Sequence, residues 1–263
     1  MKLPVPHDAF RWIDTDYGPA LVCTPLEPYA AHLFTTRRWA LGSALPGDAQ
    51  AWDEVAHAMD VGRATLVRLH QVHGATVVFR RVGELRDVNH LPDADIVVSN
   101  DPSLALAIQT ADCVPVLIAD RRTGVVAAAH AGWRGLAARV PSEAVQALGH
   151  RFDSAPSDLV AALGPSISAE RYEVGADVRQ KFEDAGFAAV ELERWFTDGS
   201  RPEHWQFDGA RSAIDQLAAA GVPADQIFAA GLCTAAYPDW LCSYRRDWKD
   251  AGRMAAVIRA RIG

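Results

Sequence analysis

Four closely spaced apolar segments in the middle of the chain constrain the fold more than any other feature. They span residues 96–98, 104–108, 114–119 and 124–129, and turn-forming residues lie between them. Each segment is apolar at nearly every position, which is the pattern of buried strands whose two faces are both covered by other elements. We therefore predict a sheet enclosed between further layers of structure.

Segments on either side supply the remaining elements of an α/β fold. Short apolar bursts separated by Gly and Pro predict edge strands at 10–13, 20–23 and 32–34. Apolar residues at helical spacing predict a helix that opens at Gly47–Asp48 and buries Trp52, Val55, Ala56 and Met59. The same pattern predicts helices from Gly135 to about Leu148 with Gly149 just past the end, at 175–185, at 208–220 and at 252–261. In the first of these, Pro141 either kinks the helix or begins a second one.

Composition narrows the class of protein. The chain has 263 residues, 49% of them apolar and 22% charged, which is typical of a folded globular protein, and we expect a single domain over 1–263. The net charge of −7, without a long basic run, makes nucleic acid and anionic membranes unexpected partners. Four widely spaced cysteines, no secretory leader pattern and no apolar stretch of about 20 residues favour a cytoplasmic protein.

Two candidate metal ligands lie at the ends of neighbouring apolar segments, and a third arrives from upstream. Cys113 and His130 are the first two, and His73 is the third. Thiolate and imidazole are the ligands that zinc prefers, and three of them leave one position open in a catalytic site. The spacing matches no compact zinc-finger motif. From the residues alone, the simpler interpretation is that Cys113 is a small buried hydrophobe and each histidine a satisfied core or surface residue.

The choice of His73 over His70 rests on strand geometry. Residues 65–73 have the character of a strand, in which His70 and His73 would point to opposite faces. Gly74 then interrupts the segment, so His73 is the better placed of the two to reach a cleft.

Several other residues could act on a substrate. Asp112, beside Cys113, could be a general base or could orient a ligand, although a turn-capping role is the simpler interpretation. The turn from His130 to Gly135 offers backbone amides and Arg134 to an anion, or it only allows tight packing. Arg37, Arg245 and Arg246 could clamp an anion through bidentate contacts, although a solvated surface position is the simpler interpretation for any one of them.

Nine motifs in order along nearly the whole chain resemble one family, the YfiH-like proteins, which are described variously as laccase-domain, multicopper polyphenol oxidase or purine nucleoside phosphorylase proteins. The matching segments are Phe34-Thr35-Thr36-Arg37, Gln71-Val72-His73-Gly74, Asp93-Ala94-Asp95, residues 109–117, His130-Ala131-Gly132-Trp133-Arg134-Gly135, Gly164-Pro165-Ser166-Ile167, Tyr172-Glu173-Val174-Gly175, Ser243-Tyr244-Arg245-Arg246-Asp247 and Gly252-Arg253-Met254-Ala255.

The resemblance implies a fold, a cofactor and an activity. The fold is a layered α/β domain of mixed β-sheets flanked by helices, likened to the cysteine-hydrolase domain of cytotoxic necrotising toxins. The cofactor is Zn²⁺ held by His73, Cys113 and His130. The activity is phosphorolysis of adenosine and inosine, with adenosine deamination and methylthioadenosine cleavage also attributed to the family. On this basis we expect catalytic roles for Asp112, Cys113 and Arg37, and contacts to nucleoside or phosphate from Arg37, Gln71, Gly132, Arg134 and Arg245.

Other functions remain open at this stage. Copper-dependent phenol oxidation needs several copper centres, whereas the nine histidines include no His-x-His pattern, so zinc is preferred over copper. Amide hydrolysis on a peptidoglycan precursor and a non-catalytic, metal-binding regulatory role are the further alternatives. The chain also departs from the family at residues 38–42, at Pro141 and at 247–253, so the resemblance carries over the metal ligands but not the substrate preference. The sequence does not define the oligomeric state.

Overall fold

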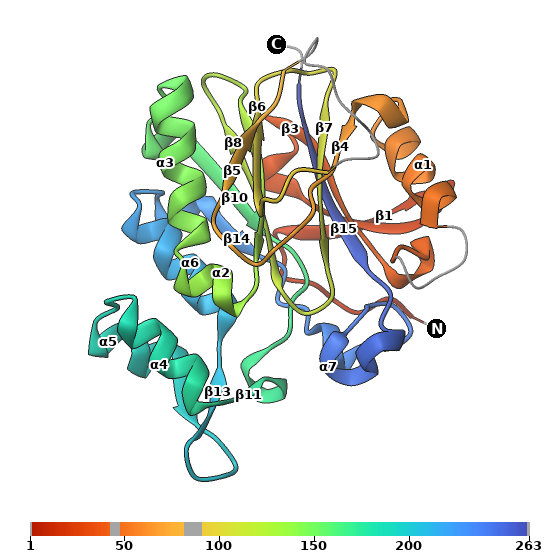
Figure 1. The fold of residues 1–263 in the computed structure, drawn as a ribbon. Coiled ribbons are helices and arrows are strands. Elements are labelled where there is room, and N and C mark those ends of the chain that lie inside the picture. Colours follow the sequence, from red (N-terminus) through yellow and green to blue (C-terminus); the bar gives the residue numbers. More distant parts are fainter. Residues whose placement is uncertain (1, 43–47, 82–90, 262–263) are drawn as a thin grey trace.

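Two six-stranded sheets form the centre of the computed structural model, which describes residues 2–42, 48–81 and 91–261 (Figure 1). The first sheet has the order β1 (Phe10–Thr15), β2 (Gly18–Cys23), β3 (Ala30–Thr35), β15 (Met254–Ala260), β7 (Ala105–Thr110) and β4 (Leu66–Val67). The second has the order β14 (Ile227–Ala229), β10 (Leu159–Leu163), β8 (Val114–Asp120), β9 (Val126–Ala131), β6 (Ile96–Ser99) and β5 (Val77–Phe79). Both sheets mix parallel and antiparallel pairs, as predicted for a layered α/β fold.

The apolar strands are covered on both faces because the two sheets stack on each other and helices cover their outer sides. In β8, Val116 and Ile118 pack toward the helices, whereas Leu117 and Ala119 pack into the core between the sheets. Successive strand residues point to opposite faces, so a strand buried on both sides must be apolar throughout. The prediction of an enclosed sheet is confirmed.

Helices cover the outer face of each sheet (Figure 1). Helix α1 (Asp48–Ala58) packs on the first sheet and, with the residue after it, buries Trp52, Val55, Ala56 and Met59 as predicted. Gly47 lies outside the described residues. The second sheet is covered by α2 (Trp133–Ala137), α3 (Val140–Phe152) and α6 (Gly209–Ala219). Within the described residues no helix is both long and apolar enough to cross a bilayer.

Pro141 marks the start of a second helix, which was one of the two predicted alternatives. Arg139 adopts a left-handed conformation (φ 62°) between α2 and α3, and Pro141 lies in the first turn of α3, where its missing N–H costs no hydrogen bond. The predicted end at Gly149 is wrong. Helix α3 continues to Phe152 and ends where Asp153 turns left-handed (φ 56°).

The predicted C-terminal helix at 252–261 is also wrong, because this segment forms the central strand β15. It pairs with β3 on one side and β7 on the other. Ala256 and Ile258 face the core between the sheets, whereas Ala255 and Val257 face α1. A run that is apolar at nearly every position fits both the helical and the strand period, so periodicity could not separate them. The predicted edge strands near the N-terminus do form, but only β1 lies at an edge.

A smaller unit extends from the helical side of the second sheet (Figure 1). It contains the sheet β11 (Glu173–Gly175), β13 (His204–Phe207) and β12 (Phe196–Asp198), together with α4 (Ala176–Asp184) and α5 (Ala189–Trp195). Its core is the aromatic group around Phe182, which contacts Trp195, Phe196 and Phe207. The predicted helices at 175–185 and 208–220 are confirmed by α4 and α6, and Asp208 caps α6 by accepting from the Arg211 amide. A short helix, α7 (Tyr244–Asp247), precedes β15.

Candidate metal centre and its pocket

Three distant segments bring His73, Cys113 and His130 together. His73 lies in the loop between β4 and β5, Cys113 immediately precedes β8, and His130 lies in β9, where it pairs with Pro115 of β8. The side-chain nitrogen and sulfur atoms of the three residues all lie within 4.8 Å of one another. The set has the donor chemistry of a metal site.

His73 reaches this position from a loop, not from a strand. Strand β4 ends at Val67, and His73 has a left-handed backbone (φ 59°), so the prediction of a strand over 65–73 is wrong beyond Val67. His70 instead forms an exposed pair with Asp93 (Nδ1 to Oδ1, 2.7 Å). His70 and His73 do point to different places, as predicted. The cause is the loop conformation and not the alternation of side chains along a strand.

Asp95 holds two of the three candidate ligands in place through hydrogen bonds. Its fully buried carboxylate accepts from the His130 ring (Nδ1 to Oδ1, 2.8 Å) and from the amides of Val72, His73 and Gly74 (3.2, 3.1 and 2.6 Å). The contact assigns the His130 proton to Nδ1, which leaves Nε2 free to bind a metal. Burial alone would raise the pKa of Asp95, but the bonds from His130 and the loop amides outweigh burial and lower it.

The Cys113 sulfur is poised to ionise. Burial opposes ionisation, but the charge and hydrogen bonds of His130 and His73 are stronger and lower the pKa of Cys113 to about 6. Burial likewise disfavours a charged His130, yet the Cys113 thiolate and Asp95 raise its pKa to about 9. The metal-free centre thus holds a thiolate beside an imidazolium, and a metal would displace the proton of His130.

A close glycine contact fits a metal site. A Cβ at Gly132 would lie 2.9 Å from both the Cys113 sulfur and the Cδ2 atom of His73, so any side chain there would push two ligands aside. One sulfur and two nitrogen donors, with a carboxylate behind one of them, match the ligand set that zinc takes in proteins. The residues present therefore fit a bound transition metal.

A pocket opens beside Cys113. It contains about 300 Å³ of empty space, counted together with its open mouth, and is lined by Trp133, Tyr172 and Phe207 in addition to Asp112 and Cys113. Aromatic walls of this kind suit a flat aromatic ligand.

Two guanidinium groups lie against the aromatic walls of the pocket. Arg134 lies over the Trp133 ring at 4.1 Å, and Arg245 lies over the Tyr172 ring at 4.9 Å. Arg245 also donates to the Glu173 carbonyl oxygen (2.8 Å). Their positive charges act on the Tyr172 hydroxyl, although burial and the Cys113 thiolate dominate there and raise the pKa of Tyr172. Two of the three arginines that were expected to contact nucleoside or phosphate thus lie against rings that line the pocket.

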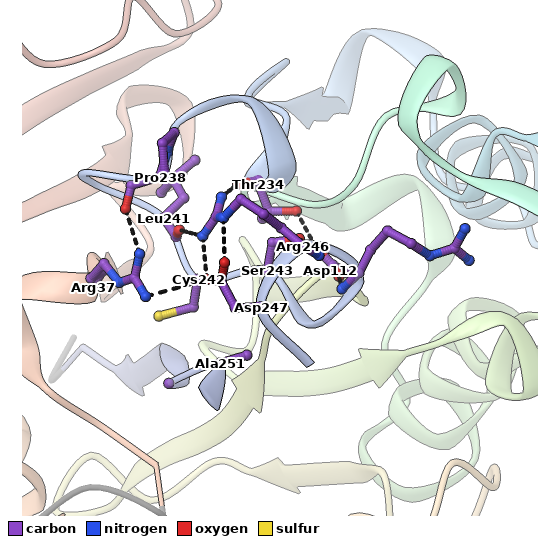
Figure 2. Close-up of polar contacts among 12 residues, drawn as sticks. Arg37, Asp112, Thr234, Pro238, Leu241, Cys242, Ser243, Arg246, Asp247 and Ala251 are labelled. Carbon is purple, nitrogen blue, oxygen red and sulfur yellow. Dashed lines mark hydrogen bonds and ion pairs between the residues drawn. The ribbon is translucent and has the colours of Figure 1, made fainter. Parts of the chain in front are cut away.

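Arg37 and Gln71 are engaged elsewhere. Figure 2 shows Arg37 donating to the Pro238 carbonyl oxygen (2.6 Å) and to Asp247 (3.2 Å). The Gln71 amide both donates to and accepts from the backbone of Gln109 (2.8 and 2.7 Å). Neither residue lines the pocket, so their expected contacts with substrate or phosphate stay predictions.

Arg246 braces the chain around α7. It donates to Asp247 and to the carbonyl oxygens of Thr234 and Leu241 (Figure 2). Because four such bonds occupy the guanidinium, its place is structural, in contrast to the anion clamp considered from the sequence.

Comparison with known proteins identifies the family. The family model described as "Multi-copper polyphenol oxidoreductase laccase" matches residues 49–261. The chain belongs to this family. Relatives in the YfiH-like family include a purine nucleoside phosphorylase of Synechocystis, 34% identical over 199 residues, which are 72% of this chain and 70% of that protein. A second, from Deinococcus radiodurans, is 39% identical over 140 residues, about half of either chain (53% of each).

Solved structures of YfiH-like proteins have the same fold. YlmD of Geobacillus stearothermophilus gives a TM-score of 0.83 at 26% identity, with 95% of this chain and 99% of that chain covered. The hypothetical protein YfiH of Bacillus licheniformis gives 0.87 at 24% identity, with 97% and 100% covered. The layered α/β architecture is therefore that of the family.

The sequence did not assign functions to three residues that the structure places at the site. Asp95 was noted only within a motif, although a histidine ligand generally needs an acceptor for its second ring nitrogen, which was a usable signal. Tyr172 and Phe207 line the pocket from the smaller unit, and no local pattern connects that unit to Cys113.

Proposed function

We propose that the protein is a zinc-dependent purine nucleoside phosphorylase that acts on adenosine and inosine. The observation that carries this proposal is that Cys113, one of the three clustered candidate ligands, lines the same pocket as three aromatic side chains, two of which have a guanidinium group over their rings. The names of the relatives from Synechocystis and Deinococcus radiodurans support the same activity.

Phosphorolysis places specific demands on such a pocket. A phosphate oxygen attacks C1′ of the ribose while the bond from C1′ to the purine nitrogen breaks. The electron pair leaves with the purine, which takes up a proton, and ribose 1-phosphate is released. The enzyme must therefore hold a dianion against a flat base and stabilise the charge that leaves with the base.

The residues of the pocket can meet these demands. Trp133, Tyr172 and Phe207 offer apolar faces for the purine, while Arg134 and Arg245 offer the charge and the fork geometry that phosphate binds best. Bound zinc would supply a fixed positive charge at the wall of the pocket.

Zinc is a better match than copper. Among the described residues, a single group of three or more potential ligand side chains could hold an ion, and it contains one thiolate and two imidazoles. Multicopper oxidation requires several linked copper centres, and this ligand set provides for one ion.

The proposal is tested by incubating the purified protein with adenosine, inosine and methylthioadenosine, with and without phosphate. We expect free base and the ribose 1-phosphate product only when phosphate is present, with deamination scored separately as release of ammonia. His73→Ala should lose both zinc and turnover, whereas His70→Ala, a neighbour outside the cluster, should keep both. Stoichiometric zinc with no phosphate-dependent product from any purine nucleoside would contradict the proposal.

A further inference from the structure

Asp112 occupies an unusual place beside the metal ligand Cys113. It is buried, with 8% of its surface exposed, and its backbone adopts a left-handed conformation (φ 91°) that few residues other than Gly, Asn and Asp tolerate. Its carbonyl oxygen accepts from the Ile167 amide (2.9 Å). The turn that presents Cys113 is therefore held in a conformation that depends on this residue.

The Asp112 carboxylate joins segments that are far apart in sequence. One oxygen accepts from the Thr234 hydroxyl (2.6 Å), and the other accepts from the backbone amide of Arg245 (2.6 Å). The second bond satisfies one of the free amides in the first turn of α7. Figure 2 shows Asp112 beside Thr234 and the α7 segment.

This arrangement links the two parts of the site. From the backbone held by Asp112, the Arg245 side chain reaches the Glu173 carbonyl and the Tyr172 ring at the pocket wall. Cys113 is the next residue along the chain from Asp112. A single carboxylate thus helps to place both the Cys113 sulfur and the backbone from which the Arg245 side chain extends.

The C-terminal side of this linkage is rigid. Arg246 is bonded to Asp247 and to the carbonyl oxygens of Thr234 and Leu241, and Arg37 is bonded to Asp247 and Pro238. Because these bonds hold Thr234 and α7 together, the Thr234 hydroxyl and the Arg245 amide keep a fixed position relative to each other when they donate to Asp112.

We propose that Asp112 is a positioning residue that fixes the metal ligand Cys113 and the anion-binding Arg245 relative to each other, in place of the general base considered from the sequence. This rests on the proposed function in taking zinc as the metal and phosphate as the anion. The Asp112 carboxylate is bonded to a hydroxyl and a backbone amide, so it holds Cys113 and Arg245 in a fixed relative position. Small displacements of reacting groups lower the rate of a catalysed reaction strongly.

Asparagine and alanine at this position separate the two roles. Asn tolerates the left-handed backbone, can accept from the Arg245 amide and can donate to the Thr234 hydroxyl, which is able to accept as well as donate. Asp112→Asn therefore preserves the linkage and removes any base. Asp112→Ala removes both, and Thr234→Val removes one bond with little change in volume.

The experiment measures zinc content, the Kd for inorganic phosphate by calorimetry, and KM and kcat in the three variants, with circular dichroism as a check of folding. We expect Asp112→Asn to stay within about threefold of wild type in every quantity, and Asp112→Ala to lose about 100-fold in kcat/KM for phosphate. Thr234→Val should lie between them, mainly through KM.

An Asp112→Asn variant that keeps its zinc and its phosphate affinity but loses kcat as fully as Asp112→Ala would overturn the proposal and make Asp112 a base. Equal phosphate Kd and zinc content in wild type and a folded Asp112→Ala would overturn it as well. Because phosphate binding and metal content need no turnover, these readouts decide the positioning role even if the nucleoside assay of the proposed function fails.

Discussion

At the scale of single residues, the chemistry of the site is controlled by groups behind the candidate ligands. Asp95 accepts four hydrogen bonds, from the His130 ring and from three consecutive amides that include that of His73. One buried carboxylate therefore fixes the orientation of one ligand and the backbone of another. The desolvation cost of burying this charge is offset only because every donor is in place.

Replacement of Asp95 by Asn should weaken zinc binding by about 10- to 100-fold, since the amide cannot accept from all four donors and His130 loses its charged partner. The measurement is a competitive titration of zinc against a chelating dye. Asp93→Asn is the matched control, because the Asp93 side chain is 73% exposed and contacts His70 instead of a ligand. Equal zinc affinity in the two variants would show that Asp95 does not orient the site.

Cys113 should differ from the buried cysteines in its reaction with alkylating agents. Its pKa is lowered to about 6, whereas burial raises the pKa of Cys23 to about 12 and that of Cys242 to about 11. In metal-free protein the thiolate of Cys113 dominates above pH 6, so its rate of labelling by iodoacetamide should fall as the pH falls through 6.

Mass spectrometry after short pulses between pH 5 and 8 follows each cysteine separately. Zinc should protect Cys113 and leave the slow labelling of Cys23 and Cys242 unchanged. A labelling midpoint above pH 8 for Cys113, or labelling that zinc does not affect, would contradict the proposed thiolate ligand.

At the scale of elements, the sequence correctly predicted strands that are buried on two faces and helices with clear caps. It failed for a segment whose apolar pattern fits both a helix and a strand. The four central strands and α4 and α6 follow directly from apolar pattern and caps. Residues 254–260 are apolar at nearly every position, so helix and strand were equally consistent until pairing with β3 and β7 decided between them. The loop position of His73 depends on Asp95, which is a long-range contact that no local pattern encodes.

The assignment of β15 as a central strand predicts that both of its faces carry stability. Ile258→Ala should cost about 3 kcal/mol through the core between the sheets, and Val257→Ala about 2 kcal/mol through the core under α1. Denaturant unfolding of each variant measures these costs. A cost near zero at either residue would mean that one face of this segment is exposed, as in a surface helix.

At the scale of the whole molecule, the site lies where separate layers meet. Cys113 and His130 come from one end of the second sheet, and His73 comes from the loop between β4 and β5. Arg245 comes from the short helix that leads into the first sheet, and Tyr172 and Phe207 come from the smaller unit. Sequence could place the ligands through motifs but could not show that the smaller unit closes the pocket. Since the proposed metal, anion and base sites take residues from different layers, all three depend on the same packing.

The most direct test of this account is a zinc titration of metal-free protein during phosphate-dependent cleavage of inosine. We predict that activity rises in proportion to added zinc and stops rising at one zinc per chain, and that His73→Ala stays inactive at every ratio while His70→Ala follows wild type. Activity that is independent of zinc, or that requires several coppers per chain, would contradict the assignment of this cluster as a single catalytic zinc centre.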